Sequence, residues 1–352
     1  MKLPLFGTTL PQLEEIAESM GLPPFTARQI ANWLYRKNVR SIDAMTNLSL
    51  ASRDRLASDY VMGLEDPAKV SASTDGTRKY LYRAGSAGNP GGSRFVEAAY
   101  IPEANRSTLC LSTQIGCKMG CLFCMTGKQG FQGQLSATEI LNQFASLPEK
   151  NSVTNLVYMG MGEPLDNLDP VMQSLEILSA DWGYGMSPAR ITVSTIGIVP
   201  GIQRFLSESG AHLAVSMHSP FEEERRRLMP VQHVYPLREV LELLRSSDMP
   251  RQRRVSFEYI VFGGLNHSPA HVKEIARLLA GIRSRVNLIR FHTIPDTPLL
   301  PATDEQMIIF QNRLKAKGIL TTIRKSRGED ILAACGLLST RELTSPAVAA
   351  DY

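Results

Sequence analysis

The chain has 352 residues, a net charge of +4, and a composition that is 43% hydrophobic and 20% charged, as is ordinary for a globular protein. Its length suits one large domain with a small one, and it has neither an apolar run of membrane-spanning length nor a signal-peptide pattern at residues 1–13. We therefore expect a protein of the reducing cytoplasm with no membrane partner. The mild positive charge permits a nucleic-acid partner without establishing one.

The first sixty residues carry the periodicity of short amphipathic helices. One helix is predicted over Leu10–Met20, where Gly21 provides a C-terminal glycine cap. Two others are predicted over Pro24–Arg36 and Ser49–Tyr60. We expect residues 1–62 to form an N-terminal helical domain, and two interpretations of it stay open: a small bundle that caps the larger domain, or a module that binds nucleic acid.

A β-hairpin is predicted next, as an extension over residues 63–102 that links the helices to the rest of the chain. Lys79–Arg83 and Arg94–Ile101 alternate as strands do. The glycine-rich stretch Ala84–Ser93 joins them. It is predicted to be a hairpin loop and not a phosphate-binding loop, because no Gly-Lys-Ser/Thr sequence follows it.

Short β-rich segments then recur along the chain, and helical patterns separate most of them. Repeated β–α units predict a parallel sheet, and six units are too few for a closed eight-stranded barrel. The predicted fold is therefore α/β, with a partial (β/α)6 TIM-like barrel over residues 103–342 and a tail at 343–352. The predicted strands are Ser107–Ser112, Asn155–Met159, Arg190–Ser194, His212–Ser216, Val255–Val261 and Val286–Phe291, with Leu320–Ile323 as a last addition.

Helix-end signals support this division. Ser136 with Glu139, and Thr303 with Gln306, have the spacing of capping boxes. Ser268 precedes a proline at the first helical position, where proline is tolerated. The predicted helices run from Ser136 through Leu147, over Leu237–Leu244, from Ser268 to about Ala280, and from Thr303 to about Gly318.

Three of the five cysteines, Cys117, Cys121 and Cys124, lie together after the first barrel strand. Gaps of three and two residues are too tight for disulfides but suit one iron–sulfur cluster, and three thiolates on a four-iron cluster leave one iron open to a substrate. Zinc is the alternative, but a closed zinc site needs four ligands, and neither a second cysteine pair nor a histidine lies nearby. The spacing therefore favours a [4Fe-4S] cluster.

Other unusual residues fall where predicted strands end. Gly160–Pro164 follows the second strand, Ser194-Thr195 ends the third, and Ser216–His218 ends the fourth. Barrel active sites are assembled at the C-terminal ends of strands. Glycines let the backbone approach a ligand closely, and Glu163 offers a carboxylate to a cation such as an ammonium group. The cysteine loop and these turns are therefore predicted to form one site.

Together these motifs resemble those of the radical S-adenosylmethionine (SAM) enzymes, which share the cysteine loop with an aromatic residue before its last cysteine and the Gly-Glu-Pro turn. The chain is more specifically similar to the RlmN/Cfr family of radical SAM RNA methyltransferases, in which two lone cysteines accompany the cluster loop. The similarity extends from about Leu10 to Leu338. It is carried by Thr108–Cys110, Gln114–Cys117, Met159–Leu165, Ser216–His218, Arg324–Ile331 and Ala333–Gly336.

The resemblance implies a reaction that uses two SAM molecules in each turnover. One methylates Cys335, and the other binds the open iron and gives a deoxyadenosyl radical after accepting an electron from a donor such as flavodoxin. That radical removes hydrogen from the new methyl group, and the resulting methylene radical adds to adenine C2. Glu97 then accepts a proton. Finally, Cys110 resolves the protein–RNA adduct, which leaves a Cys110–Cys335 disulfide. The implied substrates are adenine 2503 of 23S rRNA and adenine 37 of tRNAs, and a monomer is expected.

The same resemblance points to residues that contact SAM. At His292 the family usually has asparagine, and an imidazole can also donate or accept a hydrogen bond. Without the resemblance, His218 could equally be a core histidine whose hydrogen bonds are all made within the protein. A free cysteine is likewise usually a small buried hydrophobic residue. The predicted cofactor contacts are Gly162, Glu163, Ser194, Ser216, Met217, His218 and His292.

Basic residues form three groups after residue 220. Lys325 and Arg327, just before Cys335, are candidates for contacts with RNA phosphates. The other two groups are predicted to be solvated surface, and they consist of Arg225–Arg227 and of Arg251, Arg253 and Arg254.

Two other functions stay open. A Cfr-like enzyme would modify C8 of the same rRNA adenine. The stretch Lys128–Phe131 is more similar to the C2 enzymes, but regiochemistry does not follow from it. A non-catalytic iron–sulfur RNA-binding protein would have no use for Cys110 and Cys335.

Overall fold

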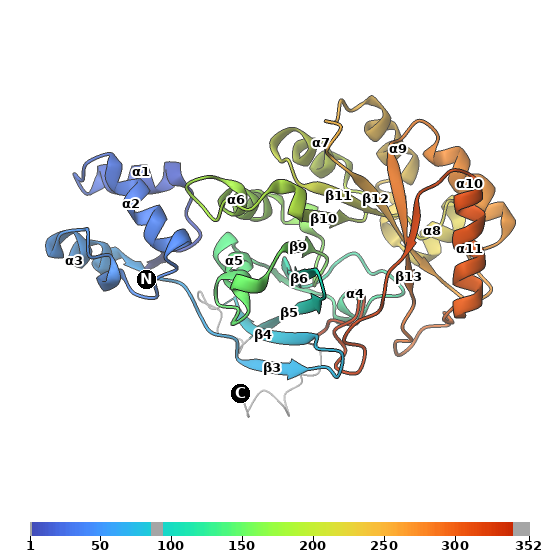
Figure 1. Cartoon of the computed structure of the whole chain (residues 1–352), viewed down its shortest axis with the longest axis horizontal. Helices are drawn as coiled ribbons and strands as arrows, with labels where there is room; N and C mark the ends of the chain where they lie inside the picture. Colours follow the sequence, from blue (N-terminus) through green and yellow to red (C-terminus); the bar gives the residue numbers. More distant parts are fainter. Residues whose placement is uncertain (1, 86–93, 341–352) are drawn as a thin grey trace.

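The structure is a computed structural model that describes residues 2–85 and 94–340. It consists of an N-terminal helical lobe, an antiparallel β extension and an α/β barrel (Figure 1). None of the helices in these ranges is long and apolar enough to cross a membrane. Residues 86–93 of the hairpin loop predicted over Ala84–Ser93, and the predicted tail at 343–352, lie outside the described residues.

The N-terminal lobe contains the three predicted helices. Thr9 and Gln12 form a capping box at the start of α1, and Gly21 follows its end with a φ of +63°, as a glycine cap requires. The second helix changes at Asn32–Arg36 into one π-helical turn. The elements are β1 (Leu3–Pro4), α1 (Leu10–Ser19), α2 (Phe25–Ala31), a 3₁₀ turn (Ile42–Ala44), α3 (Leu50–Asp59) and β2 (Tyr60–Val61), with β1 and β2 parallel.

A ten-stranded sheet organises the rest of the chain, in the order β14-β13-β12-β11-β10-β9-β6-β5-β4-β3. Pairs from β14 to β6 are parallel and those from β6 to β3 are antiparallel. All predicted strands are present, and β3 is an additional one. Their bounds are β3 (Lys69–Ala72), β4 (Arg78–Ala84), β5 (Arg94–Glu103), β6 (Arg106–Cys110), β9 (Asn155–Tyr158), β10 (Ile191–Thr195), β11 (His212–Ser216), β12 (Val255–Val261), β13 (Ser284–Arg290) and β14 (Thr321–Ile323).

Helices cover the outer face of this curved sheet (Figure 1). On β10, Ile191, Val193 and Thr195 are buried beneath them, whereas Thr192 and Ser194 alternate to the inside of the barrel and are half-buried. Both predicted capping boxes form. The helices are α5 (Ala137–Ala145), α6 (Leu168–Ser179), α7 (Val199–Glu208), α8 (Glu222–Leu228), α9 (Leu237–Ser246), α10 (Pro269–Leu279) and α11 (Asp304–Ala316).

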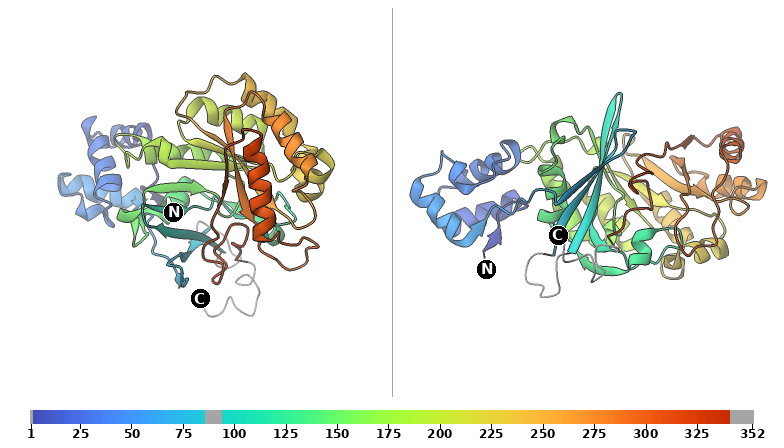
Figure 2. Two further views of the ribbon diagram at one scale, coloured as in Figure 1. Left: turned by 45° about the vertical axis from the view of Figure 1, so that its right-hand side comes forward. Right: turned by 90° about the horizontal axis from the view of Figure 1, so that it is seen from below.

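The chain after β14 returns to the opposite end of the sheet (Figure 2). The Gly328 amide donates to Asp75 over 3.0 Å, and the Ser73 hydroxyl donates to Asp330 over 2.6 Å. Further on, the Thr340 hydroxyl donates to the carbonyl of Phe95 on β5. The segment 324–340 thus links the β14 edge to the β3–β5 extension, and it carries Cys335 across the mouth of the barrel.

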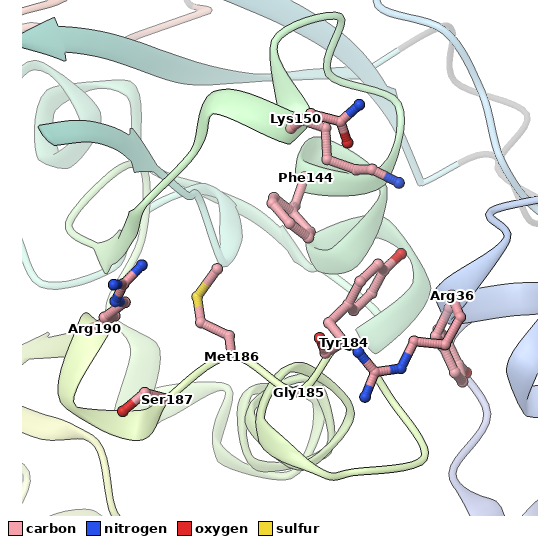
Figure 3. A pocket seen from close by; sticks show the side chains of 10 residues that line it. Arg36, Phe144, Lys150, Tyr184, Gly185, Met186, Ser187 and Arg190 are labelled. Atoms are coloured by element: carbon pink, nitrogen blue, oxygen red, sulfur yellow. Dashed lines mark hydrogen bonds between the residues drawn. The ribbon is translucent and has the colours of Figure 1, made fainter.

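A cavity of about 510 Å³ lies where the N-terminal lobe meets the barrel (Figure 3). Arg36 donates to the carbonyls of Asp181 and Tyr184 there, over 2.6 and 3.0 Å, and fastens the lobe to the loop after α6. Phe144 packs edge-on against the Tyr184 ring. None of the residues predicted for the active site lines this cavity.

Candidate active site

The cysteine loop lies between two short strands that pair with each other, β7 (Gln114–Gly116) and β8 (Phe131–Gln134). Gly116 has a φ of +72°, and a Cβ there would come within 1.7 Å of the Gly130 carbonyl oxygen, so only glycine allows this close approach. The Cys117 amide donates to that carbonyl. Cys124 ends the loop as the N-cap of α4 (Met125–Gln129).

The three loop thiols are near enough to interact electrostatically. Burial raises the pKa of Cys117 to about 12, and it raises that of Cys121 well above its ordinary value; charge on the neighbouring thiolates adds to both shifts. In the described part of the chain, no three His, Cys, Asp or Glu side chains converge as ligands of a single metal ion do. In a cubane cluster, three thiolates bind three different irons, and these irons are the cations that buried thiolates need. The three cysteines therefore fit a [4Fe-4S] cluster.

Glu163 is almost completely buried at the Gly-Glu-Pro turn beside this loop. Its carboxylate accepts hydrogen bonds from the amides of Ile196 and Leu165, over 2.9 and 3.1 Å. Burial raises its pKa to about 7 in spite of these bonds. Gly162 has a φ of +96° and packs directly on Gln114, where a Cβ would meet that side chain at 2.5 Å. Glu163 thus holds the turn against the end of β10, and its contact with SAM stays a prediction.

The other predicted cofactor residues lie at the ends of β10 and β11. Ser194 and Ser216 are half-buried on the inside of the barrel, and the Met217 side chain is fully buried. His218 has a φ of +54°, and its Nδ1 accepts the Ile260 amide over 3.0 Å. Burial, with Arg225 nearby, lowers its pKa to about 3, so the ring is neutral. It packs edge-on against Phe123 of the cysteine loop, with ring centroids 4.6 Å apart.

The two lone cysteines come together at the mouth of the barrel. Cys110, at the end of β6, is buried and pairs with Ala99 of β5 in the sheet register. Burial raises its pKa to about 12, and charge on Cys335 contributes. Cys335 as a residue is exposed to solvent. Its thiol is nevertheless surrounded by protein atoms, and this desolvation raises the pKa of the thiol. Both are free thiols in the structure.

The Cys335 segment also packs on the cluster loop. The Met125 amide donates to the Gly336 carbonyl over 2.8 Å, and the Thr126 hydroxyl donates to the Leu338 carbonyl over 2.6 Å. Charge on Cys124 affects the pKa of Cys335. The structure therefore brings the predicted methyl-accepting cysteine, the predicted resolving cysteine and the predicted cluster ligands into one site.

Sequence reasoning missed a polar row inside the barrel. The register places Ser216, Glu258, Asn287 and Thr322 side by side on β11 to β14. Asn287 donates to the Glu258 carboxylate over 2.8 Å, and the guanidinium of Arg324 lies 3.5 Å from it. The sequence did contain a signal for this row, because Glu258 is a charged residue inside the largely apolar run Val255–Val261.

Arg324 connects this row to the two lone cysteines. Desolvation of the Arg324 guanidinium lowers its pKa. The negative charges of Glu258, Cys335 and Cys110 outweigh this effect, so the pKa of Arg324 is raised. In return, Arg324 lowers the pKa of both thiols against the effect of burial. It is thus placed to favour the thiolate, which is the nucleophilic form of cysteine.

We expect Arg324→Met to slow alkylation of Cys335. A nearby opposite charge shifts a pKa by roughly one to three units. Iodoacetamide should therefore label Cys335 of the Arg324→Met variant roughly tenfold more slowly than Cys335 of the unaltered protein at pH 8. The rate in the unaltered protein should still rise above pH 9, since the pKa is raised. Peptide mass spectrometry measures it, and Lys325→Gln, at the exposed neighbour, is the control. Equal rates in all three proteins would contradict this role.

Glu97 lies on β5 two residues from Ala99, so both side chains point to the same face of the strand. It is 5% exposed, its Oε1 lies 2.8 Å from Nζ of Lys79, and its Oε2 accepts the Ser339 amide over 2.9 Å. The role of Glu97 as a proton acceptor stays a prediction. The amide contact ties Glu97 to the segment that carries Cys335.

The histidine that replaces the usual asparagine has protein partners on both ring nitrogens. His292 Nε2 lies 2.9 Å from the Ser326 hydroxyl, and Nδ1 lies 3.2 Å from a carboxylate oxygen of Glu329. A contact between His292 and SAM would require one of these to be exchanged, so it stays a prediction. Of the predicted RNA contacts, Lys325 is exposed, whereas Arg327 lies 3.8 Å from Asp75.

The prediction that two arginine groups are solvated surface is wrong at two positions. Arg225 is fully buried beside the cysteine loop. Arg253 is 7% exposed and donates to the carbonyls of Phe205 and Leu206 near the C-terminus of α7, where unpaired carbonyls and the helix dipole favour a cation. Local sequence could not reveal this, because the acceptors come from distant segments.

Comparison with known proteins identifies the class of this fold. The sequence profile of the radical SAM superfamily matches residues 111–279, and that of the "Ribosomal RNA large subunit methyltransferase N-terminal domain" matches residues 3–62. The crystal structure of a radical SAM methyltransferase from Sphaerobacter thermophilus superposes with a TM-score of 0.86 at 37% identity, covering 96% of this chain and 99% of that one. The fold is therefore that of a radical SAM methyltransferase.

Full-length relatives narrow the assignment. A Bacteroides fragilis protein named "Probable dual-specificity RNA methyltransferase RlmN" is 53% identical over 96% of this chain and 97% of its own length. A Parabacteroides distasonis protein of the same name is 54% identical over the same shares. The chain belongs to the RlmN family of radical SAM RNA methyltransferases.

Proposed function

We propose that this enzyme methylates C2 of adenine 2503 in 23S rRNA and of adenine 37 in tRNAs, through a methyl group first placed on Cys335. The observation that carries the proposal is the meeting of Cys335 and Cys110 beside the cluster loop, because a cluster-binding RNA-binding protein has no use for two extra thiols there. Full-length similarity to proteins named RlmN supports the C2 assignment over the Cfr-like alternative.

The residues of the site divide the reaction between them. Cys117, Cys121 and Cys124 would hold the cluster, which together with two SAM molecules in each turnover would supply the methyl group and the radical chemistry. Arg324 favours the thiolates at Cys335 and Cys110, so the first attacks a methyl group and the second attacks the sulfur-linked adduct. In the second attack, Cys110 forms an S–S bond with Cys335 as the bond between the Cys335 sulfur and the methylene carbon breaks. The carbon leaves with the electron pair, takes up a proton and becomes the methyl group of the RNA, and a later reduction must reopen the Cys110–Cys335 disulfide.

Glu97→Gln should uncouple SAM cleavage from product formation. The amide keeps the shape but accepts no proton, and loss of a general base lowers rates roughly 10²- to 10⁴-fold. We therefore expect SAM cleavage to continue while methylated RNA falls at least roughly a hundredfold, as measured by chromatography of both products. Glu103→Gln, at a half-buried glutamate at the end of the same strand, is the control. Normal methylation by Glu97→Gln would remove Glu97 from the mechanism.

Analysis of cellular RNA tests the proposal as a whole. Nucleoside mass spectrometry of 23S rRNA and tRNA from a strain lacking this gene should show loss of 2-methyladenosine, and the intact gene should restore it. Loss of the C8 isomer alone would identify the Cfr-like activity. Unchanged RNA would favour a non-catalytic role.

We further propose a monomer that acts in the reducing cytoplasm, where free thiols and the cluster persist, with a flavodoxin-type electron donor. Lys325 is an exposed cation on the segment that leads to Cys335, and its position supports contact with RNA phosphates at the barrel mouth. The target adenine would have to leave its stack to reach the thiols inside.

A further inference from the structure

Arg225 is a buried arginine with an incomplete set of partners. It lies on α8 with no solvent exposure. Its Nη2 donates to the carbonyls of Ile196 and Ser216, over 2.7 and 3.2 Å, and its Nη1 donates to the Gln232 side chain. Its Nε–H is buried and has no hydrogen-bond acceptor. All three acceptors are neutral, so the guanidinium charge is not neutralised by them.

No carboxylate of the described residues forms an ion pair with Arg225, although its neighbour Arg226 pairs with Glu223. Burial lowers the pKa of Arg225 to about 10, so it remains charged at neutral pH, and the Cys121 thiolate is the group whose charge opposes that lowering. An unpaired buried charge is destabilising by several kcal/mol, and a compensating anion is therefore expected beside it.

The surroundings of Arg225 show where that anion belongs. The end of α8 contacts the cysteine loop directly, because the Leu122 amide donates to the Leu228 carbonyl over 3.0 Å. The carbonyls that Arg225 binds lie at the C-terminal ends of β10 and β11, beside Ser194 and at Ser216. Arg225 thus lies among the cluster ligands and the predicted cofactor turns.

We propose that Arg225 is the buried countercharge of the iron–sulfur cluster and a positioning residue that sets its reduction potential. A [4Fe-4S]²⁺ core with three thiolates carries one net negative charge, and one electron from a reductant such as dithionite adds a second, with no bond formed or broken. A fixed cation and an unused N–H donor stabilise the more negative state, and both raise the potential of a cluster. This inference rests on the cluster proposed at Cys117, Cys121 and Cys124.

Redox titration of the anaerobically purified, full-length protein tests it, with reduced cluster followed by electron paramagnetic resonance (EPR). Arg225→Gln removes the charge and should make reduction at least tenfold less favourable, which is a shift of 59 mV to more negative potential for one electron. Arg225→Lys retains the charge and should recover most of the shift. Arg227→Gln, at the exposed position on the same helix, should leave the potential unchanged.

Equal potentials in the unaltered, Gln and Lys proteins would overturn the proposal, as would equal shifts in Gln and Lys, which indicate a purely structural role. If Arg225→Gln does not fold, pulsed EPR of the unaltered protein labelled with ¹⁵N-arginine decides instead. Without SAM, a ¹⁵N coupling to the reduced cluster is expected, and its absence would overturn the proposal. A protein that lacks iron and sulfide altogether would overturn the proposed function as well, so the two failures are distinguishable.

Discussion

Cys335→Ala should abolish both methylated protein and methylated RNA, with a loss of activity of roughly a thousandfold or more, as removal of a covalent nucleophile causes. Cys335 is the exposed thiol at the barrel mouth, next to Arg324 and tied to the cluster loop through Gly336. Alanine has no sulfur to receive the methyl group. Mass spectrometry of the protein and of the RNA measures both losses.

Cys110→Ala should stop the same reaction at a later stage. Cys110 is buried and pairs with Ala99, so alanine fits there without disturbing the strand. The variant should still carry methyl on Cys335 and still attack RNA, but it should accumulate a covalent protein–RNA adduct, visible as a slower, nuclease-sensitive band.

The two cysteine variants serve as controls for each other, and both should keep their full iron content. Normal turnover by Cys110→Ala would show that Cys110 is a packed strand residue. RNA methylation by Cys335→Ala would overturn the assignment of the methyl carrier.

Replacing Cys117, Cys121 and Cys124 together by alanine should remove about four irons and the matching sulfide from each chain, as expected for one cubane cluster. Burial strongly raises the pKa of the Cys117 and Cys121 thiols when no cation is bound. Loss of the cluster should therefore abolish SAM cleavage completely. Iron and labile-sulfide assays on anaerobically purified protein measure the change.

The iron content of Cys110→Ala is the matched control, because that variant also loses a thiol near the site but no predicted cluster ligand. Tightly bound zinc without labile sulfide in the unaltered protein would contradict the radical mechanism. Iron retained by the triple variant would place the cluster ligands elsewhere.

Much of the fold and the site could be predicted because the signals are local. The capping boxes at Ser136 and Thr303 depend on residues three positions apart, and both form. Strand periodicity located β9 to β13 to within about two residues, since it reflects a face buried by helices. Cys117, Cys121 and Cys124 are close in space because they are close in sequence.

The sequence therefore predicted the parallel strands, several of the helices, the cluster loop and, through its resemblance, the class of enzyme. Which distant groups meet depends on the tertiary fold. Glu258 and Arg324 adjoin Cys110 and Cys335 because of strand register and the return of segment 324–340. Arg225 lies in a charged run, which predicts a surface position. It can be buried because the carbonyls of Ile196, just after β10, and of Ser216, at the end of β11, accept its hydrogen bonds. Such contacts join residues far apart along the chain, so no local pattern encodes them.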